Sequence, residues 1–357
     1  MTRVAAVILH PGPVPDAGPL ATAFASIRRA NAERQANGFA GAGATADIAD
    51  DLTAGESFGE RIRAIAAAAG PSTQGLVLLG SGSIPLARAV DRRAFVAVAG
   101  GPAGHALANN RYSADVVAVA GTDRLRTVPS LAADNGLPRW LASTGVDVAD
   151  LRRRWHLQVD LDSPLDALLA SPRATGRMLA GAGIPLAALA RAWSGVVAAT
   201  RDPRRELLVA GRASAAGLAW LERSTASRTR ALIEERGFRT RSDEQRPARS
   251  SLGLVLDRDG PEALGARLAE LADAAVIDSR VLLAHRLGTH EGRWPLVEDR
   301  FASDLLLPDR IADPWLRALT ASAVAAPIPI LLGGHSLVGP GLRLLLRGDP
   351  PGSGAWT

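Results

Sequence analysis

The sequence predicts an α/β protein: a three-layer sandwich with a mainly parallel sheet, followed by a mostly helical second domain. In the first half, short apolar runs alternate with Ala-rich helical segments, as in repeated βαβ units. From about residue 173 the helical segments lengthen and the apolar runs become rare. Aromatic residues make up only 4% of the chain, so the core must be built from Ala, Leu and Val.

The elements of the first half follow from this alternation. Gly75–Gly80 is apolar without alternation, which indicates a strand buried on both faces. The expected strands are Val4–Leu9, Thr45–Ile48, Gly75–Gly80, Phe95–Ala99 and Ala114–Ala120, with Val159 and its neighbours closing the sheet. The expected helices are Leu20–Gly38, Phe58–Ala69, a short helix within Ile84–Arg93, Leu137–Ser143 and Val148–Arg154.

The second half reads differently. Helices are expected over 173–201, 207–236, 261–274, 301–306 and 314–326, with strand-like runs at 275–277 and 327–332. The polar segment 239–251 is expected to be a linker. The predicted organisation is therefore an α/β domain over 1–172, a mostly helical domain of unknown role over 173–347, and a flexible Gly/Pro-rich tail over 348–357.

Composition excludes several chemistries. The net charge is +5, and the chain has no lysine and no cysteine. It therefore has no Schiff base, no phosphate-loop lysine and no thiolate. The arginines are spread through the chain and balanced by acids, so no nucleic-acid partner is expected. No uninterrupted apolar segment is long enough for a membrane span, and the absence of cysteine fits the cytoplasm.

Residues 160–166 (DLDSPLD) are the most informative stretch. On a strand, side chains two apart point the same way, so Asp160 and Asp162 are expected to aim both carboxylates at one spot at a carboxyl end. Open α/β sheets bind ligands there, and such a pair suits Mg²⁺ held together with substrate phosphates. The alternative is helix capping by Ser163 and Asp166, which leaves Asp160 unexplained.

Other polar groups are candidates for ligand contacts. Backbone N–H groups of the turn over Gly80, Ser81, Gly82 and Ser83 could bind phosphate, or the segment could be a tight structural turn. Three residues before a strand could contact a base or sugar, or cap that strand: Asn109, Asn110 and Arg111. The cluster Arg152–Arg154 is either a phosphate clamp or a solvated helix end.

The second half offers weaker candidates. His285 and His290 are five residues apart, which does not match a helical metal pair, and no HExxH pattern is present. The stretch 333–336 (GGHS) follows a buried strand and is typical of an anion-binding turn. Ser336 lacks the context of a nucleophile elbow, so hydrolase chemistry is not expected. The Leu- and Ala-faced helices are compatible with a homodimer or with plain core packing.

Three motifs together resemble the nucleotide-diphospho-sugar transferase superfamily, which has the glycosyltransferase-A fold. They are GERI at 59–62, VLLGSGSIPL at 77–86 and DLDSPLD at 160–166, so the resemblance covers roughly residues 1–170. The most similar branches are small nucleotidyltransferases of the phospholactate and molybdenum-cofactor guanylyltransferase types. The resemblance implies a nucleotide-binding domain in which the acids of DLDSPLD help hold Mg²⁺ and the nucleotide phosphates.

Two departures from that pattern matter. Gly82 stands where the superfamily usually has an aspartate, and the first loop has no arginine before Arg28.

The leading expectation is a cytoplasmic Mg²⁺-dependent nucleotidyltransferase-like enzyme that moves a nucleoside monophosphate from an NTP to a small phosphorylated acceptor. The alternatives are a glycosyltransferase that uses a nucleotide sugar, and a non-catalytic scaffold, which the glycine at position 82 favours.

Overall fold

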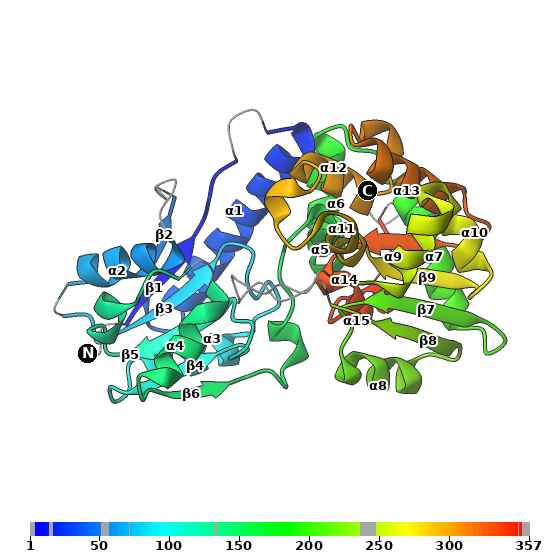
Figure 1. Cartoon of the computed structure of the whole chain (residues 1–357). Coiled ribbons are helices and arrows are strands. Elements are labelled where there is room, and N and C mark those ends of the chain that lie inside the picture. The colour runs from blue at the N-terminus through cyan, green and yellow to red at the C-terminus, as the bar shows by residue number, and fades with distance from the viewer. Residues whose placement is uncertain are drawn as a thin grey trace. The chain divides into compact units, whose positions relative to one another are not determined.

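The computed structural model describes residues 4–13, 17–50, 57–70, 72–131, 134–235, 248–348 and 350–351 (Figure 1). The chain divides into two compact units. Unit 1 is Met1–Val14 with Ala25–Leu161, and unit 2 is Pro15–Phe24 with Asp162–Thr357. The division thus falls at 161/162 rather than after 172. Most of the expected linker, 239–247, and most of the expected tail lie outside the described residues.

Unit 1 contains a mixed six-stranded sheet in the order β2-β1-β3-β5-β4-β6. Its strands are β1 (Val4–Leu9), β2 (Thr45–Ala49), β3 (Gly75–Gly80), β4 (His105–Ala108), β5 (Val116–Ala120) and β6 (Asp147–Asp150). β1 pairs in parallel with β2 and β3, and β4 with β6. β5 runs antiparallel to both of its neighbours, β3 and β4. The expectation of a mainly parallel sheet therefore needs this one correction.

Helices cover both faces of this sheet. On one face, Ile8 of β1 and Val77 of β3 pack with α1 (Pro19–Ala40) and α3 (Ala89–Ala99). On the other face, Leu76 and Leu78 of β3 pack with α2 (Phe58–Ala68) and α4 (Leu137–Ser143). Alternate residues of β3 serve opposite cores, as the period of a strand requires. Unit 1 is therefore a three-layer α/β/α unit.

The ends of the helices in unit 1 follow local chemistry. Ser57 and Glu60 form a capping box at the start of α2: the Glu60 N–H donates to Ser57 Oγ at 3.3 Å and the Ser57 N–H donates to Glu60 Oε2 at 2.7 Å. α3 begins after Arg88, whose N–H donates to Asp91 Oδ2 at 2.9 Å. The expected strand over 95–99 is therefore wrong, because these residues continue α3. The expected helix over 148–154 is also wrong, because Val148 lies in β6.

Unit 2 is also α/β, with a parallel four-stranded sheet in the order β10-β9-β7-β8. Its strands are β7 (Glu206–Gly211), β8 (Arg228–Ile233), β9 (Ala274–Asp278) and β10 (Ile330–Gly333). The strand-like runs expected in this half correspond to β9 and β10. The single helix expected over 207–236 is wrong, since β7, α8 (Ala215–Ser224) and β8 occupy it. The expectation of a mostly helical domain overlooked this sheet.

Helices surround the sheet of unit 2. Those before the sheet are α5 (Pro164–Ala170), α6 (Pro172–Gly181) and α7 (Ala187–Thr200), and α9 (Ser251–Asp259) and α10 (Leu264–Ala269) precede β9. Later helices are α11 (Ser279–Leu287), α12 (Val297–Asp304), α13 (Pro314–Ala325), α14 (His335–Val338) and α15 (Leu342–Leu345). α7 packs against β7, β9 and β10. None of the helices in the described ranges is long and apolar enough to cross a membrane.

Candidate functional site

A cavity of about 150 Å³ lies at the carboxyl ends of β1 and β3 in unit 1. Leu9 ends β1 and Gly80 ends β3. Because β5 is antiparallel to β3, the start of β5 lies at the same edge and brings Asp115 to the cavity. Its lining consists of Leu9, Pro11, Arg28, Phe58, Arg61, Leu78, Leu79, Gly80, Ala114, Asp115, Val117 and Leu137. This is the edge at which open α/β sheets bind ligands.

Two arginines reach this cavity from different helices. Arg28 lies on α1, which follows β1, and Arg61 lies in the first turns of α2, which follows β2. The sequence analysis considered basic residues in the first loop, which has none, and predicted no ligand contact for Arg28 or Arg61. For Arg61 the available signal was the βαβ order itself, because a helix that follows a strand begins at the carboxyl edge of the sheet. Arg28 lies in the third turn of α1, so this signal does not locate it.

Three buried polar atoms at this edge make no hydrogen bond within the described part of the chain: Arg28 Nε, His10 Nδ1 and Ser81 Oγ. His10 directly follows β1 and Ser81 directly follows β3. Burial, and then the charge of Arg28, lower the pKa of His10, which keeps its imidazole neutral near pH 7. An unsatisfied buried polar group costs about 1–3 kcal/mol, and a polar ligand at this edge would offset that cost.

The turn after β3 is occupied by the protein's own hydrogen bonds. The Ser81 N–H donates to Leu9 O at 2.8 Å, and the Ser83 N–H donates to Gly80 O at 3.0 Å. The carbonyls of Ser81 and Ser83 accept hydrogen bonds from the Asn31 side chain at 2.7 and 3.3 Å. Phosphate binding by the backbone N–H groups of Ser81 and Ser83 is therefore not supported, and the structural alternative describes this turn.

Gly82 leaves no room for a larger residue. A Cβ at this position would lie 2.8 Å from Leu161 O and 3.1 Å from Asp160 Oδ1. The Leu161 N–H also donates to Gly82 O at 3.1 Å. The aspartate that the family resemblance leads one to expect here would collide with the segment that carries Asp160.

The two aspartates predicted to share a metal lie in different units and not on a strand of the sheet. Asp160, in unit 1, is half-buried and forms an isolated antiparallel bridge with Ser83. Asp162 is exposed and begins unit 2. The expected alternation of side chains along a strand is wrong at this point, because the chain leaves a 3₁₀ turn at 155–157 and pairs for a single residue only.

Three further candidates, Asn109, Asn110 and Arg111, make contacts within unit 1. Asn109 uses its whole amide: Nδ2 donates to Asp115 Oδ2 at 2.8 Å and to Leu157 O at 2.9 Å, and Oδ1 accepts from the N–H groups of Asp115 and Val116. Asn110 Oδ1 accepts from the Tyr112 N–H at 3.1 Å, which forms a local turn. Arg111 lies over the ring of Tyr112, 5.6 Å from its centroid.

The Arg152–Arg154 cluster does not converge on a common site. Arg152 lies over the Tyr112 ring, and Arg154 Nη1 donates to Asp91 Oδ1 at 2.6 Å. His156 Nε2 lies 2.8 Å from the other oxygen of Asp91. The phosphate clamp is therefore not supported for Arg154, whose charge is neutralised by a buried carboxylate.

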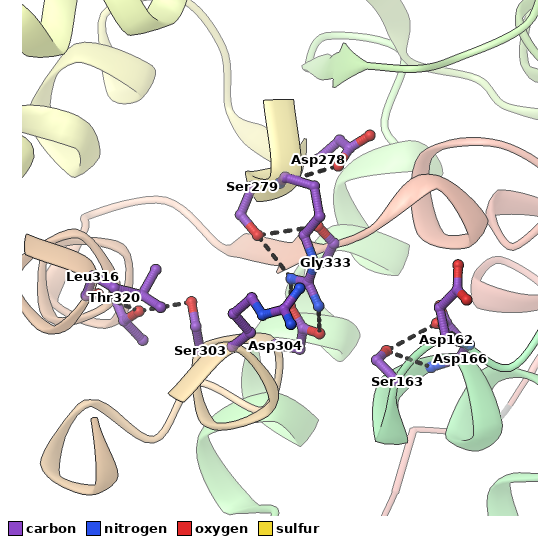
Figure 2. Close-up of polar contacts among 12 residues, drawn as sticks. Asp162, Ser163, Asp166, Asp278, Ser279, Ser303, Asp304, Leu316, Thr320 and Gly333 are labelled. Carbon is purple, nitrogen blue, oxygen red and sulfur yellow. Dashed lines mark hydrogen bonds and ion pairs between the residues drawn. The ribbon is translucent and has the colours of Figure 1, made fainter. Parts of the chain in front are cut away.

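The carboxyl edge of the sheet in unit 2 holds a second polar cluster (Figure 2). Asp278 ends β9 and is fully buried. Arg212, which follows β7, donates to it from Nε at 2.6 Å and from Nη2 at 3.1 Å. Burial is the largest single effect and raises the pKa of Asp278, but Arg212, His335 and Arg280 together lower it, and the net shift is downward. This pair is an ionised, bidentate salt bridge at the strand ends.

A neighbouring network braces the same edge. Arg280 pairs in a bidentate manner with Asp304, and its Nη1 also donates to Ser279 Oγ at 3.0 Å. Ser279 Oγ in turn donates to Gly333 O at the end of β10, at 3.1 Å (Figure 2). Both carboxylate oxygens of Asp304 are therefore hydrogen-bonded, and this network gives structural support that joins α11, β10 and α12.

Asp166 differs from these residues because one of its oxygens has no hydrogen-bond partner among the residues that the structure describes. Ser163 caps α5 as predicted, because its Oγ accepts from the Asp166 N–H at 3.3 Å. The predicted return contact differs: Asp166 Oδ2 accepts from Ser163 Oγ at 2.9 Å and from the Asp162 N–H at 3.2 Å, not from the Ser163 N–H (Figure 2). Its Oδ1 is buried and makes no hydrogen bond within the described ranges. Burial, followed by the charges of Asp162 and Asp304, raises the pKa of Asp166 well above its usual value.

The residues present fit magnesium only as an ion that arrives with a phosphorylated ligand. No three His, Cys, Asp or Glu side chains gather as a metal site in the described ranges. Mg²⁺ is commonly bound through one or two carboxylates, with phosphates and water completing the shell. In unit 1, Asp115 is the carboxylate that lines the cavity.

Comparisons with known proteins add little. No protein-family model matches the chain, and no curated protein matches it. Among solved structures, the chain is similar to Rv0371c from Mycobacterium tuberculosis H37Rv, at 19% identity. That match covers 42% of this chain and 87% of the other, with a TM-score of 0.27.

Proposed function

We propose that unit 1 is a nucleotide-binding domain of the glycosyltransferase-A type, and that the protein is a Mg²⁺-dependent nucleotidyltransferase-like enzyme. The observation that carries this proposal is Arg28 Nε, a buried donor that lacks a partner in the described part of the chain, beside a cavity at the strand ends. A guanidinium left unsatisfied at this edge suits a phosphate oxygen, because Arg–phosphate hydrogen bonds are charge-assisted.

The lining of the cavity offers an apolar environment for the base and a charged one for the phosphates. Its walls are mostly apolar, with Phe58, Leu78 and Leu137 among them, and they suit the flat face of a base. At about 150 Å³ it is smaller than the roughly 300–1,000 Å³ of sites that enclose a whole ligand. The base would therefore occupy the cavity while the phosphates extend along Arg28 and Arg61.

The chemistry would depend on positioning and electrostatics. A phosphate oxygen of the acceptor attacks the α-phosphorus of the NTP, the bond to the β-phosphate oxygen breaks, and pyrophosphate leaves with that electron pair. Arg28 and Arg61 would neutralise charge that spreads over the phosphate oxygens. Magnesium, when bound with the nucleotide near Asp115, would supply further charge neutralisation.

Calorimetric titration of the full chain with GTP, CTP and UTP in the presence of Mg²⁺ tests this proposal. Arg28→Gln shortens the side chain and removes its charge and its guanidinium, and we expect it to weaken nucleotide binding at least tenfold, or about 1.4 kcal/mol. Arg93→Gln is the matched control, since Arg93 is exposed on α3 and does not line the cavity. Equal loss in both variants, or no nucleotide binding by the parent protein, would contradict the proposal.

A non-catalytic scaffold is the second candidate, because the carbonyl of Leu161 fills the space where an acidic metal ligand is expected at position 82. Release of pyrophosphate in the presence of NTP and a phosphorylated acceptor separates the two. Binding of nucleotide without turnover would favour the scaffold, and turnover of a UDP-sugar instead would indicate glycosyl transfer.

A further inference from the structure

The order of the strands in unit 2 defines a second location for a ligand. From β7 the chain moves to β8 on one side, and then to β9 and β10 on the other side. The direction of winding therefore changes between β7 and β9. In open parallel sheets, ligands bind outside the carboxyl ends of the two strands that flank such a change. Arg212 follows β7 at this point, and Asp278 ends β9.

The backbone at this point is built for a close approach. Gly211 has φ +125°, and a Cβ there would lie 2.2 Å from the Cβ of Asp278. Glycine therefore allows the end of β7 to meet Asp278 directly. Two helices begin here, α8 after β7 and α11 after β9. Their first turns leave backbone N–H groups without intrahelical partners and carry the positive end of the helix dipole.

Arg212 has N–H groups beyond those that bind Asp278. Its bonds to Asp278 use Nε and Nη2, and its Nη1 makes no hydrogen bond within the described residues. The side chain is only 13% exposed, and the bidentate pair fixes its orientation. A guanidinium held in this way presents its remaining N–H groups without further loss of side-chain freedom, as a preorganised anion contact does.

Asp166 supplies the second, independent observation. It is 1% exposed, and its Oδ1 has no hydrogen-bond partner among the described residues. Its helix, α5, lies over the end of β10, because a Cβ at Gly333 would come within 3.1 Å of Leu165 Cδ2. Since β7, β9 and β10 run parallel, the end of β10 lies at the same edge of the sheet as Arg212 and Asp278. These groups therefore belong to one edge of unit 2.

We propose that the carboxyl edge of the sheet in unit 2 binds a hydroxylated phosphate ester, with Arg212 and the start of α8 contacting the phosphate and Asp166 contacting a hydroxyl group. A hydroxyl suits Asp166 because it can donate to a carboxylate or accept from a carboxylic acid. A phosphate suits Arg212 because the fork of the guanidinium matches phosphate oxygens. Sugar phosphates and nucleotides share this chemistry. The site is separate from the unit 1 cavity and does not depend on the function proposed for it.

Titration calorimetry with ribose 5-phosphate tests this site. The full chain carries Arg28→Gln, so that binding at the unit 1 cavity is weakened. We expect saturable binding, with inorganic phosphate at least tenfold weaker and ribose without detectable binding. AMP tested in parallel distinguishes the two sources: tighter binding of AMP indicates a nucleotide, and tighter binding of ribose 5-phosphate a sugar phosphate. Failure of both phosphate esters to bind would overturn the proposal.

Two variants assign the binding to these residues. Arg212→Lys keeps the charge but loses the fork, and we expect affinity for ribose 5-phosphate to fall at least tenfold. Any change at Arg212 can leave the buried Asp278 carboxylate unpaired and so destabilise the fold. The double variant Arg212→Gln with Asp278→Asn avoids this because both side chains are neutral, and we expect the same loss of affinity for ribose 5-phosphate. Arg205→Lys is the matched control, because Arg205 precedes β7 at the opposite end and pairs with Asp202 at 3.7 Å.

The contact proposed between Asp166 and a hydroxyl group is tested by the selectivity between ribose 5-phosphate and inorganic phosphate. Asp166→Asn is expected to reduce the preference for ribose 5-phosphate over inorganic phosphate at least threefold, while inorganic phosphate itself binds as before. Binding that is unchanged in the folded Arg212 variants, or reduced equally by Arg205→Lys, would overturn the assignment.

Discussion

At the scale of single residues, unmet hydrogen-bonding capacity distinguishes the residues proposed to bind ligands from the structural ones. Asn109 is buried and polar, but all its donors and acceptors are used inside unit 1. Arg28 and Asp166 each retain a buried atom without a partner in the described ranges. Folded proteins satisfy nearly all buried polar atoms, so such exceptions require a reason. Ligand binding is the reason proposed here for both residues.

The buried Asp166 carboxyl makes stability depend on pH. Its folded pKa is raised by burial, then by Asp162, so its contribution to stability is present below the unfolded value near 3.9 and is lost as pH rises through the folded value. Asp166→Asn stays neutral, so we expect its melting temperature relative to the parent to rise between pH 4 and pH 8. A difference that stays constant or falls over this range would show that Asp166 is ionised without penalty.

At the scale of elements, the turn between β3 and α3 is fixed by its own backbone and by the segment around Asp160. Gly82→Ala would place a Cβ 2.8 Å from a backbone carbonyl that cannot move alone. We expect the free energy of unfolding to fall by about 1–3 kcal/mol, as for other overpacked positions, and by more for Gly82→Asp. Urea denaturation measures both, with Gly12→Ala as the control, because nothing lies within 4 Å of that position. A Gly82→Asp protein as stable as the parent would mean that an acidic ligand fits here.

The elements predicted best are those whose sequence pattern is compatible with one type of secondary structure only. β3 and β9 are short, wholly buried apolar runs, and both were located from the sequence. β7, α8 and β8 were merged into one helix because leucines recur among many charges along this segment, at positions 208, 218, 221 and 232. The breaks inside that segment, Gly211 at positive φ and the cap of α8 by Ser214, are short-range signals that this spacing concealed.

At the scale of the whole molecule, the candidate sites depend on contacts between distant parts of the chain. Arg28 and Arg61 are far apart in sequence and meet only because α1 and α2 each follow a strand of one sheet. Arg212 and Asp278 likewise meet because β7 and β9 pair in parallel. Sequence spacing carries no information on such pairings until the order of the strands is known. The cavity of unit 1 lies at the carboxyl edge where a ligand site was predicted, and of the residues predicted for that site its lining includes Gly80.

A crystal structure of the full chain soaked with Mg²⁺ and a non-hydrolysable GTP analogue tests the central claim most directly. The account predicts electron density for the base in the unit 1 cavity and a phosphate oxygen within hydrogen-bond distance of Arg28 Nε. Nucleotide density that leaves this cavity empty, or a nucleotide bound there without any contact to Arg28, would contradict it.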